Sequence, residues 1–156
     1  MRRSLLLAAA LVAIPLAAAA QEQAPSPAPA GLTPEQIVAA RQSAYVLSGG
    51  AFASMKAAAD GGADVRALVF PARALVRWAR TLPSMFPAGT DLPGSKALPA
   101  VWSDRAGFEA RAATYAAAAQ TLAEAAQAGD RAVFLQRWAY VRATCSGCHD
   151  VYRSSD

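Results

Sequence analysis

Apolar side chains recur at alternating spacings of three and four residues from Thr33 to the C-terminal region, and this is the period of an α-helix. The same region is rich in alanine and has few β-branched runs, which favours helix over strand. Four such segments can be distinguished, each about 20 to 27 residues long. Helices with one apolar face bury those faces against one another, so the pattern predicts an all-α fold, an antiparallel four-helix bundle.

The ends of the first two predicted helices are marked by particular residues. Thr33 is an N-cap with Gln36 in the capping-box position, and Gly61-Gly62 ends the segment. The second segment begins at Asp64 but contains Pro71, which has no backbone N–H to donate. Two readings follow for the second helix: a kink at the proline, or a start one turn later.

The second half of the chain is predicted to hold one long loop and two helices. Residues 83–99 contain four prolines and two glycines, too many for a regular element. The third helix is predicted to be capped near Ser103 and to end around Gly129. The fourth is predicted to be capped by Asp130 and to run to Tyr152.

The first 31 residues are predicted to lie outside the bundle. Residues 1–20 combine two arginines, an apolar run, and Ala18 and Ala20 at the positions that precede a signal-peptide cleavage site. We expect cleavage there and export to the periplasm, since the apolar run is shorter than the roughly 20 residues of a membrane anchor. Residues 21–31 are rich in proline, alanine and glutamine and are predicted to be a flexible leader. The bundle is assigned to residues 32–156.

The charge of the chain does not indicate nucleic-acid binding, although the formal net charge is +4 and the pI is about 9.5. Two of the 15 basic residues, Arg2 and Arg3, lie in the predicted signal peptide, which leaves 13 against 11 acidic residues. A nearly neutral chain without a basic patch lacks the electrostatic footprint of a nucleic-acid-binding protein. The absence of a charged patch also leaves any redox partner unspecified.

Residues 145–149 read C-S-G-C-H, the C-x-x-C-H pattern of covalent haem attachment. On a helix, Cys145 and Cys148 lie on one face and can form thioethers with two vinyl groups of one porphyrin, while His149 turns its imidazole toward the iron. A disulfide redox pair would need a βαβ setting, and a zinc site would need four ligands where the chain has two cysteines and one histidine. One covalent haem c per chain is the predicted cofactor.

A sixth iron ligand, if there is one, must come from upstream of the motif, because His149 is the only histidine and no methionine follows it. A Ser-His-Asp triad would need this same residue, so we expect no catalytic residues. Arg41 and Tyr45 fall on the apolar face of the first helix, where aliphatic residues are expected. Either a haem lies there, with a carboxylate beside Arg41 and a face against Tyr45, or both side chains reach past the apolar face to solvent.

Four stretches of the sequence carry a family resemblance. Residues 41–45 read R-Q-S-A-Y, residues 52–56 read F-A-S-M-K, residues 101–104 read V-W-S-D, and residues 145–153 read C-S-G-C-H-D-V-Y-R. Together they resemble the cytochrome c′ family, the class II c-type cytochromes, over nearly all of residues 31–153. The stretches match that family's first-helix pattern, its F-x-x-M-K stretch, its tryptophan entry to the third helix and its C-terminal haem motif.

The resemblance implies a five-coordinate, high-spin haem with a buried distal pocket that admits small gases. Five residues of this sequence then take family roles at the cofactor. They are the thioether residues Cys145 and Cys148, the proximal iron ligand His149, the propionate partner Arg41 and the distal residue Tyr45.

The resemblance also implies roles for residues outside the haem motif and the first helix. Phe86 would line the distal side, Arg153 would be a basic neighbour of the proximal face, and Trp102 would pack against the cofactor edge or in the core. The family is often dimeric through its first two helices, so we expect a homodimer. The small residues Gly49-Gly50 on the first helix agree with such a contact or are only a local weakness.

The function that the resemblance implies is gas binding, with nitric oxide as the physiological ligand and carbon monoxide as a probe. An alternative is a low-spin electron-transfer cytochrome of the same fold with an internal sixth ligand, and a third reading is a haem module with neither role. Tyr45 takes the place of the distal methionine of low-spin relatives, and a neutral phenol with an ordinary pKa near 10 is a poor iron ligand. Met55 lies about 15 Å further along the helix, whereas Met85 could enter from the loop.

Overall fold

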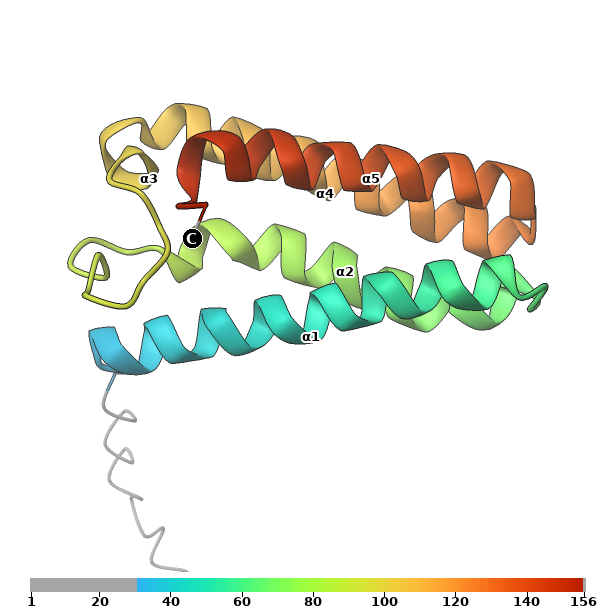
Figure 1. Cartoon of the computed structure of the whole chain (residues 1–156), viewed down its shortest axis with the longest axis horizontal. Helices are drawn as coiled ribbons and strands as arrows, with labels where there is room; N and C mark the ends of the chain where they lie inside the picture. Colours follow the sequence, from blue (N-terminus) through green and yellow to red (C-terminus); the bar gives the residue numbers. More distant parts are fainter. Residues whose placement is uncertain (1–30, 156) are drawn as a thin grey trace, which may run out of the picture. The chain divides into compact units, whose positions relative to one another are not determined.

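The computed structural model describes residues 31–155, so the predicted signal peptide and nearly all of the predicted leader lie outside the described residues. Four long helices dominate: α1 (Pro34–Asp60), α2 (Val69–Thr81), α4 (Arg105–Ala128) and α5 (Arg131–Tyr152). Three short elements join them, the 3-10 helices η1 (Val65–Leu68) and η2 (Leu82–Met85) and the helix α3 (Ala100–Ser103). Figure 1 shows α1 running alongside α2 and α4 alongside α5. The predicted all-α four-helix architecture is confirmed.

The caps that the sequence predicts are formed at three of the helix ends. Thr33 accepts a hydrogen bond from the Gln36 backbone (3.3 Å) and its own N–H donates to the Gln36 side chain (2.9 Å), which completes a capping box. Asp130 caps α5 by accepting from the Val133 N–H. Gly129 ends α4 with a φ of 78°, a conformation that favours glycine.

The cap of the third long helix lies one residue beyond the predicted Ser103. The chain leaves α3 at Asp104, whose φ of −115° and ψ of 56° break the helix, and the Asp104 carboxylate accepts from the Gly107 N–H to start α4. Ser103 is instead the last residue of α3. The break re-aims the chain between the loop and α4, which the local sequence pattern did not reveal.

The second predicted helix starts one turn later than its cap residue. Asp64 caps η1 rather than an α-helix, and α2 begins at Val69. Pro71 is then the third residue of α2, in the first turn, where backbone N–H groups have no partner inside the helix. The helix has 13 residues and is shorter than predicted, because 3-10 turns replace α-helix at both its ends.

Two clusters of buried side chains form the core. The larger lies where α1, α2, α4 and α5 meet and includes the fully buried Met55, Leu122 and Phe134. The smaller lies at the loop end of the bundle and is built around Phe86 and Phe108. The helix α4 packs closely against both α2 and α5, whereas α1 and α5 touch at few points. In Figure 1, α1 and α5 diverge toward the end at which α1 begins.

The last residue of α5 and the residues that follow it hold the long loop in place. The Leu98 N–H donates to the Tyr152 carbonyl (3.0 Å), the Ser154 N–H donates to the Lys96 carbonyl (2.9 Å), and Ala97 pairs with Arg153 in an isolated β-bridge. The loop predicted between residues 83 and 99 therefore begins with a 3-10 turn and ends in a short antiparallel contact. Within residues 31–155, no helix is long and apolar enough to span a membrane.

Candidate functional site

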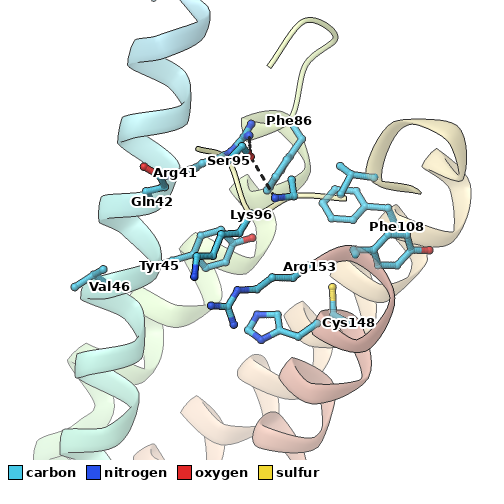
Figure 2. A pocket seen from close by; sticks show the side chains of 14 residues that line it. Arg41, Gln42, Tyr45, Val46, Phe86, Ser95, Lys96, Phe108, Cys148 and Arg153 are labelled. Carbon is cyan, nitrogen blue, oxygen red and sulfur yellow. Dashed lines mark hydrogen bonds between the residues drawn. The ribbon is translucent and has the colours of Figure 1, made fainter. Parts of the chain in front are cut away.

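A cavity of about 480 Å³ lies at the loop end of the bundle, between α1, the loop and the last turn of α5 (Figure 2). A second cavity of about 150 Å³ lies among α1, α2, α4 and α5. Tyr45, Cys148 and His149 line both, so the two spaces adjoin at these three residues. The volume of the larger cavity lies in the range of small-molecule and cofactor sites.

The helix α5 brings the residues of the C-x-x-C-H motif to the cavities. Cys145 lines the smaller cavity, and Cys148 and His149 line both. Both cysteines are free and half-buried, and burial raises the pKa of each thiol, with Cys145 adding to the effect at Cys148. Partial burial lowers the pKa of His149, and the positive charge of Arg153 lowers it further by a smaller amount. The neutral, metal-binding form of the imidazole is therefore favoured.

Tyr45 reaches from α1 toward the same space. Figure 2 shows its ring extending away from α1 into the cavity, on the side where Arg153 and Cys148 also lie. The rings of Tyr45 and Trp78 pack edge to face, with their centroids 5.2 Å apart and their planes at 88°. The side chain is 36% exposed, and it borders both cavities.

Arg41 is buried, with 2% of its surface exposed, and it holds the loop. One terminal nitrogen donates to the Met85 carbonyl (3.1 Å) and the Thr90 hydroxyl (2.8 Å), and the other to the Thr90 carbonyl (2.7 Å) and the Ser95 hydroxyl (2.9 Å). The guanidinium also lies 4.3 Å from the centroid of the Phe86 ring. The ion pairs within residues 31–155 do not include Arg41, so this buried cation lacks a carboxylate partner there.

The other residues that the sequence singled out are divided between the cavity and its surroundings. Phe86 is buried and lines the larger cavity, and Arg153 lines it from the end of α5. Trp102 lines neither cavity. Its indole donates to the Pro87 carbonyl (3.0 Å) and packs beside Phe86, so in this structure it supports the loop from outside the cavity.

Several lining residues were missed by sequence reasoning. Trp78 is spaced three and four residues from the apolar Leu75 and Leu82, so helical periodicity could have placed it on the inner face of α2. Lys96 lies in an irregular loop and Arg111 lies beside an apolar position on α4, and neither has a local signal that points to the cavity. Their positions depend on long-range packing.

Comparison with known proteins agrees with this geometry. A sequence model of cytochrome c′ matches residues 36–153. The chain belongs to the cytochrome c′ family. Cytochrome c′ of Rubrivivax gelatinosus is 39% identical over 123 residues, which cover 77% of this chain and 95% of that protein.

Solved cytochrome c′ structures share the fold. The nitric oxide complex of the L16A mutant of cytochrome c′ from Alcaligenes xylosoxidans is 30% identical, with a TM-score of 0.74 over 81% of this chain and 99% of that one. A cytochrome c′ with an unusual ligand-controlled dimer dissociation is 26% identical, with a TM-score of 0.76 over 81% of this chain and 100% of that one.

The cofactor of this cytochrome c′ is covalent haem c, and three observations show that the cavities suit it. The sequence has only two cysteines, and both line the cavities. The lining is dominated by apolar and aromatic side chains, which suits the porphyrin ring. Arg41 places a positive charge without a carboxylate partner at the edge of the larger cavity, where a haem carboxylate would offset the cost of a buried charge.

Proposed function

We propose that this cytochrome c′ is a periplasmic protein whose five-coordinate, high-spin iron binds small gases. Nitric oxide is the physiological ligand in this proposal, and carbon monoxide serves as a probe. When bound, haem iron supplies a coordination position that takes small diatomic ligands. The periplasmic location rests on the signal peptide predicted for residues 1–20.

The proposal depends on which side chains line the two cavities beside His149. The cavities beside His149 are lined by neither a methionine nor a second histidine, the usual sixth ligands of low-spin cytochromes. Met55 is fully buried in the larger core cluster, and Met85 packs against the smaller cluster while its carbonyl accepts from Arg41. Tyr45 is the residue of α1 that lines both cavities together with His149.

The residues of the site then have distinct roles in the proposal. Cys145 and Cys148 hold the haem through thioethers, and the neutral imidazole of His149 is its axial ligand. Arg41 supplies positive charge for a propionate. Its two terminal nitrogens are committed to the loop, so only its Nε–H is left to donate directly. Arg153 lies on the same side as His149 and adds a second positive charge near the cavity.

Relatives and exposed side chains support the choice of ligand and a dimeric state. A related cytochrome c′ has been solved as a nitric oxide complex, and another undergoes ligand-controlled dimer dissociation. On this chain, Val46 and Leu47 of α1 and Phe70 of α2 are 76%, 74% and 83% exposed. A second copy that covers these side chains would remove apolar surface from water, so a homodimer through α1 and α2 is part of the proposal.

The test is the absorption spectrum of the purified holoprotein, ferric and ferrous, before and after addition of carbon monoxide or nitric oxide. We expect high-spin spectra that shift when either gas is added. A low-spin spectrum that ignores both gases would replace this proposal with the electron-transfer alternative, because it would require an internal sixth ligand.

A further inference from the structure

We propose that the Tyr45 hydroxyl donates a hydrogen bond to the outer atom of a ligand bound opposite His149. The site would then select ligands by their ability to accept a hydrogen bond as well as by size. This inference rests on the proposed function, since it requires an open position on the iron.

The Tyr45 hydroxyl has no partner among residues 31–155. Apart from the backbone hydrogen bonds of α1, the described hydrogen bond at Tyr45 uses its backbone carbonyl, which accepts from the Ser48 hydroxyl (3.1 Å). Two polar side chains that line the same cavity are engaged with the loop: Arg41 donates from both terminal nitrogens to it, and the Ser95 hydroxyl accepts from Arg41 and from the Ala97 N–H. Because no described residue uses this hydroxyl, it is available to donate to a guest in the cavity.

The ring of Tyr45 is oriented toward the space that a ligand would occupy. Its contact with Trp78 supports one side of the ring, while α1 carries the backbone. Tyr45 borders the larger cavity together with Phe86, and it borders the smaller one together with Cys145. Figure 2 shows the hydroxyl on the far side of the ring from α1, directed into the cavity. The hydroxyl therefore points into the space that Tyr45 lines together with Cys148 and His149.

The phenol stays protonated in this setting. Burial raises the pKa of Tyr45 well above its usual value near 10, and this effect outweighs the opposing charges of Arg41 and Arg153. The hydroxyl is therefore a neutral donor throughout the physiological pH range. Hydrogen bonds to acceptors that carry negative charge are about twice as strong as those between neutral groups. The favoured ligands are consequently small anions and diatomics whose outer atom becomes negative on binding, whereas carbon monoxide is a weak acceptor.

The experiment compares Tyr45→Phe, which keeps the ring and removes the hydroxyl, with the wild-type holoprotein. Cyanide is titrated into the ferric protein and carbon monoxide into the ferrous protein. We expect cyanide affinity to fall about tenfold and carbon monoxide affinity to change by less than about twofold. The infrared stretching frequency of bound carbon monoxide should rise, because the hydroxyl no longer draws electron density toward its oxygen. The control is Tyr140→Phe, which alters a half-exposed phenol outside both cavities.

Two outcomes would overturn the inference in distinguishable ways. If Tyr45→Phe changes the affinities for cyanide and carbon monoxide by the same factor and leaves the stretching frequency in place, the ring acts only by its bulk and the hydroxyl has no role. If the wild-type protein is low-spin and binds neither probe, the proposed function fails and this inference fails with it.

Discussion

Arg41 joins two parts of the molecule that are distant in sequence, the helix α1 and the loop that follows α2. Its planar guanidinium makes four hydrogen bonds to the loop at Met85, Thr90 and Ser95 and lies over the Phe86 ring. A lysine carries the same charge but cannot present two parallel pairs of donors. The loop wall of the cavity therefore depends on the shape of this side chain as much as on its charge.

Arg41→Lys is expected to lower the free energy of unfolding by about 2 to 4 kcal/mol, because it leaves buried loop carbonyls without donors. Urea denaturation measures the change, and amide hydrogen exchange in residues 86–97 should become faster. Arg77→Lys on α2 is the matched control, since the Arg77 side chain is exposed, and it should change stability by less than about 0.5 kcal/mol. Equal effects at the two positions would contradict a loop-holding role for Arg41.

Tyr45 also allows a direct test of its place opposite the iron. A methionine thioether is a good ligand for haem iron, whereas a neutral phenol is not. Tyr45→Met is expected to convert the ferric absorption spectrum from high-spin to low-spin. Leu47→Met places the same thioether two residues further along α1, at a position that is 74% exposed and lines neither cavity, and should leave the spectrum high-spin. A high-spin spectrum for Tyr45→Met would show that Tyr45 does not lie over the iron.

At the scale of the elements, the contact between the start of α4 and the end of α5 requires a glycine at position 107. A Cβ at Gly107 would collide with the Asp104 carboxylate and would lie 2.6 Å from the Tyr152 hydroxyl. That hydroxyl donates to the same carboxylate (2.7 Å), which also caps α4. Gly107 thus permits a three-way contact that ties the start of α4 to the end of α5.

Gly107→Ala is expected to destabilise the protein by more than about 1 kcal/mol, although alanine is the better helix former. Gly50→Ala in α1 should do the opposite and add up to about 1 kcal/mol, because a Cβ there meets no atom within 4 Å. Thermal or urea unfolding of the two variants at one protein concentration tests the contrast. A stabilising Gly107→Ala would mean that the cap and the tyrosine shift without cost.

The hydrogen bond from the Tyr152 hydroxyl to the Asp104 carboxylate predicts a loss of stability at alkaline pH. Donation to the Asp104 carboxylate raises the pKa of Tyr152 in the folded chain, and burial adds to the effect. An unfolded tyrosine ionises near pH 10. Above that pH the unfolded chain releases a proton that the folded chain still binds, so stability falls as pH rises through this window. Urea midpoints should fall less steeply with pH in Tyr152→Phe than in wild type, and an unchanged slope would contradict a role for this hydrogen bond.

Local sequence signals predicted the helices well where a cap or a glycine marks the end. Thr33, Gly129 and Asp130 act as expected because capping involves residues within one turn. Burial of Arg41 excludes the alternative in which its side chain reaches solvent, but its partners lie in an irregular loop far along the chain, so no local pattern could identify them. The break at Asp104 likewise depends on a contact with Tyr152 from another helix.

At the scale of the whole molecule, the exposed apolar side chains of α1 and α2 predict how the chain self-associates. Leu47→Glu would place a charge in the proposed dimer contact, where it would lose its hydration without gaining a partner. We expect sedimentation to show a dimer for wild type and a monomer for Leu47→Glu at the same concentration. Val133→Glu on α5, at a position that is 37% exposed, should remain dimeric. Dissociation of both variants would place the contact elsewhere.

The two walls of the cavity come from opposite ends of the described chain, with Tyr45 on α1 and the haem motif on α5. This separation has a kinetic consequence. Residues 145–149 lie within one short stretch, so their mutual geometry needs only a local helix, which forms early. The approach of α1 closes a long stretch of chain and is therefore the slower event. We expect residues 145–149 to reach the geometry needed for thioether formation before α1 packs against α5. The haem can then be attached while the chain is still open and be enclosed afterwards.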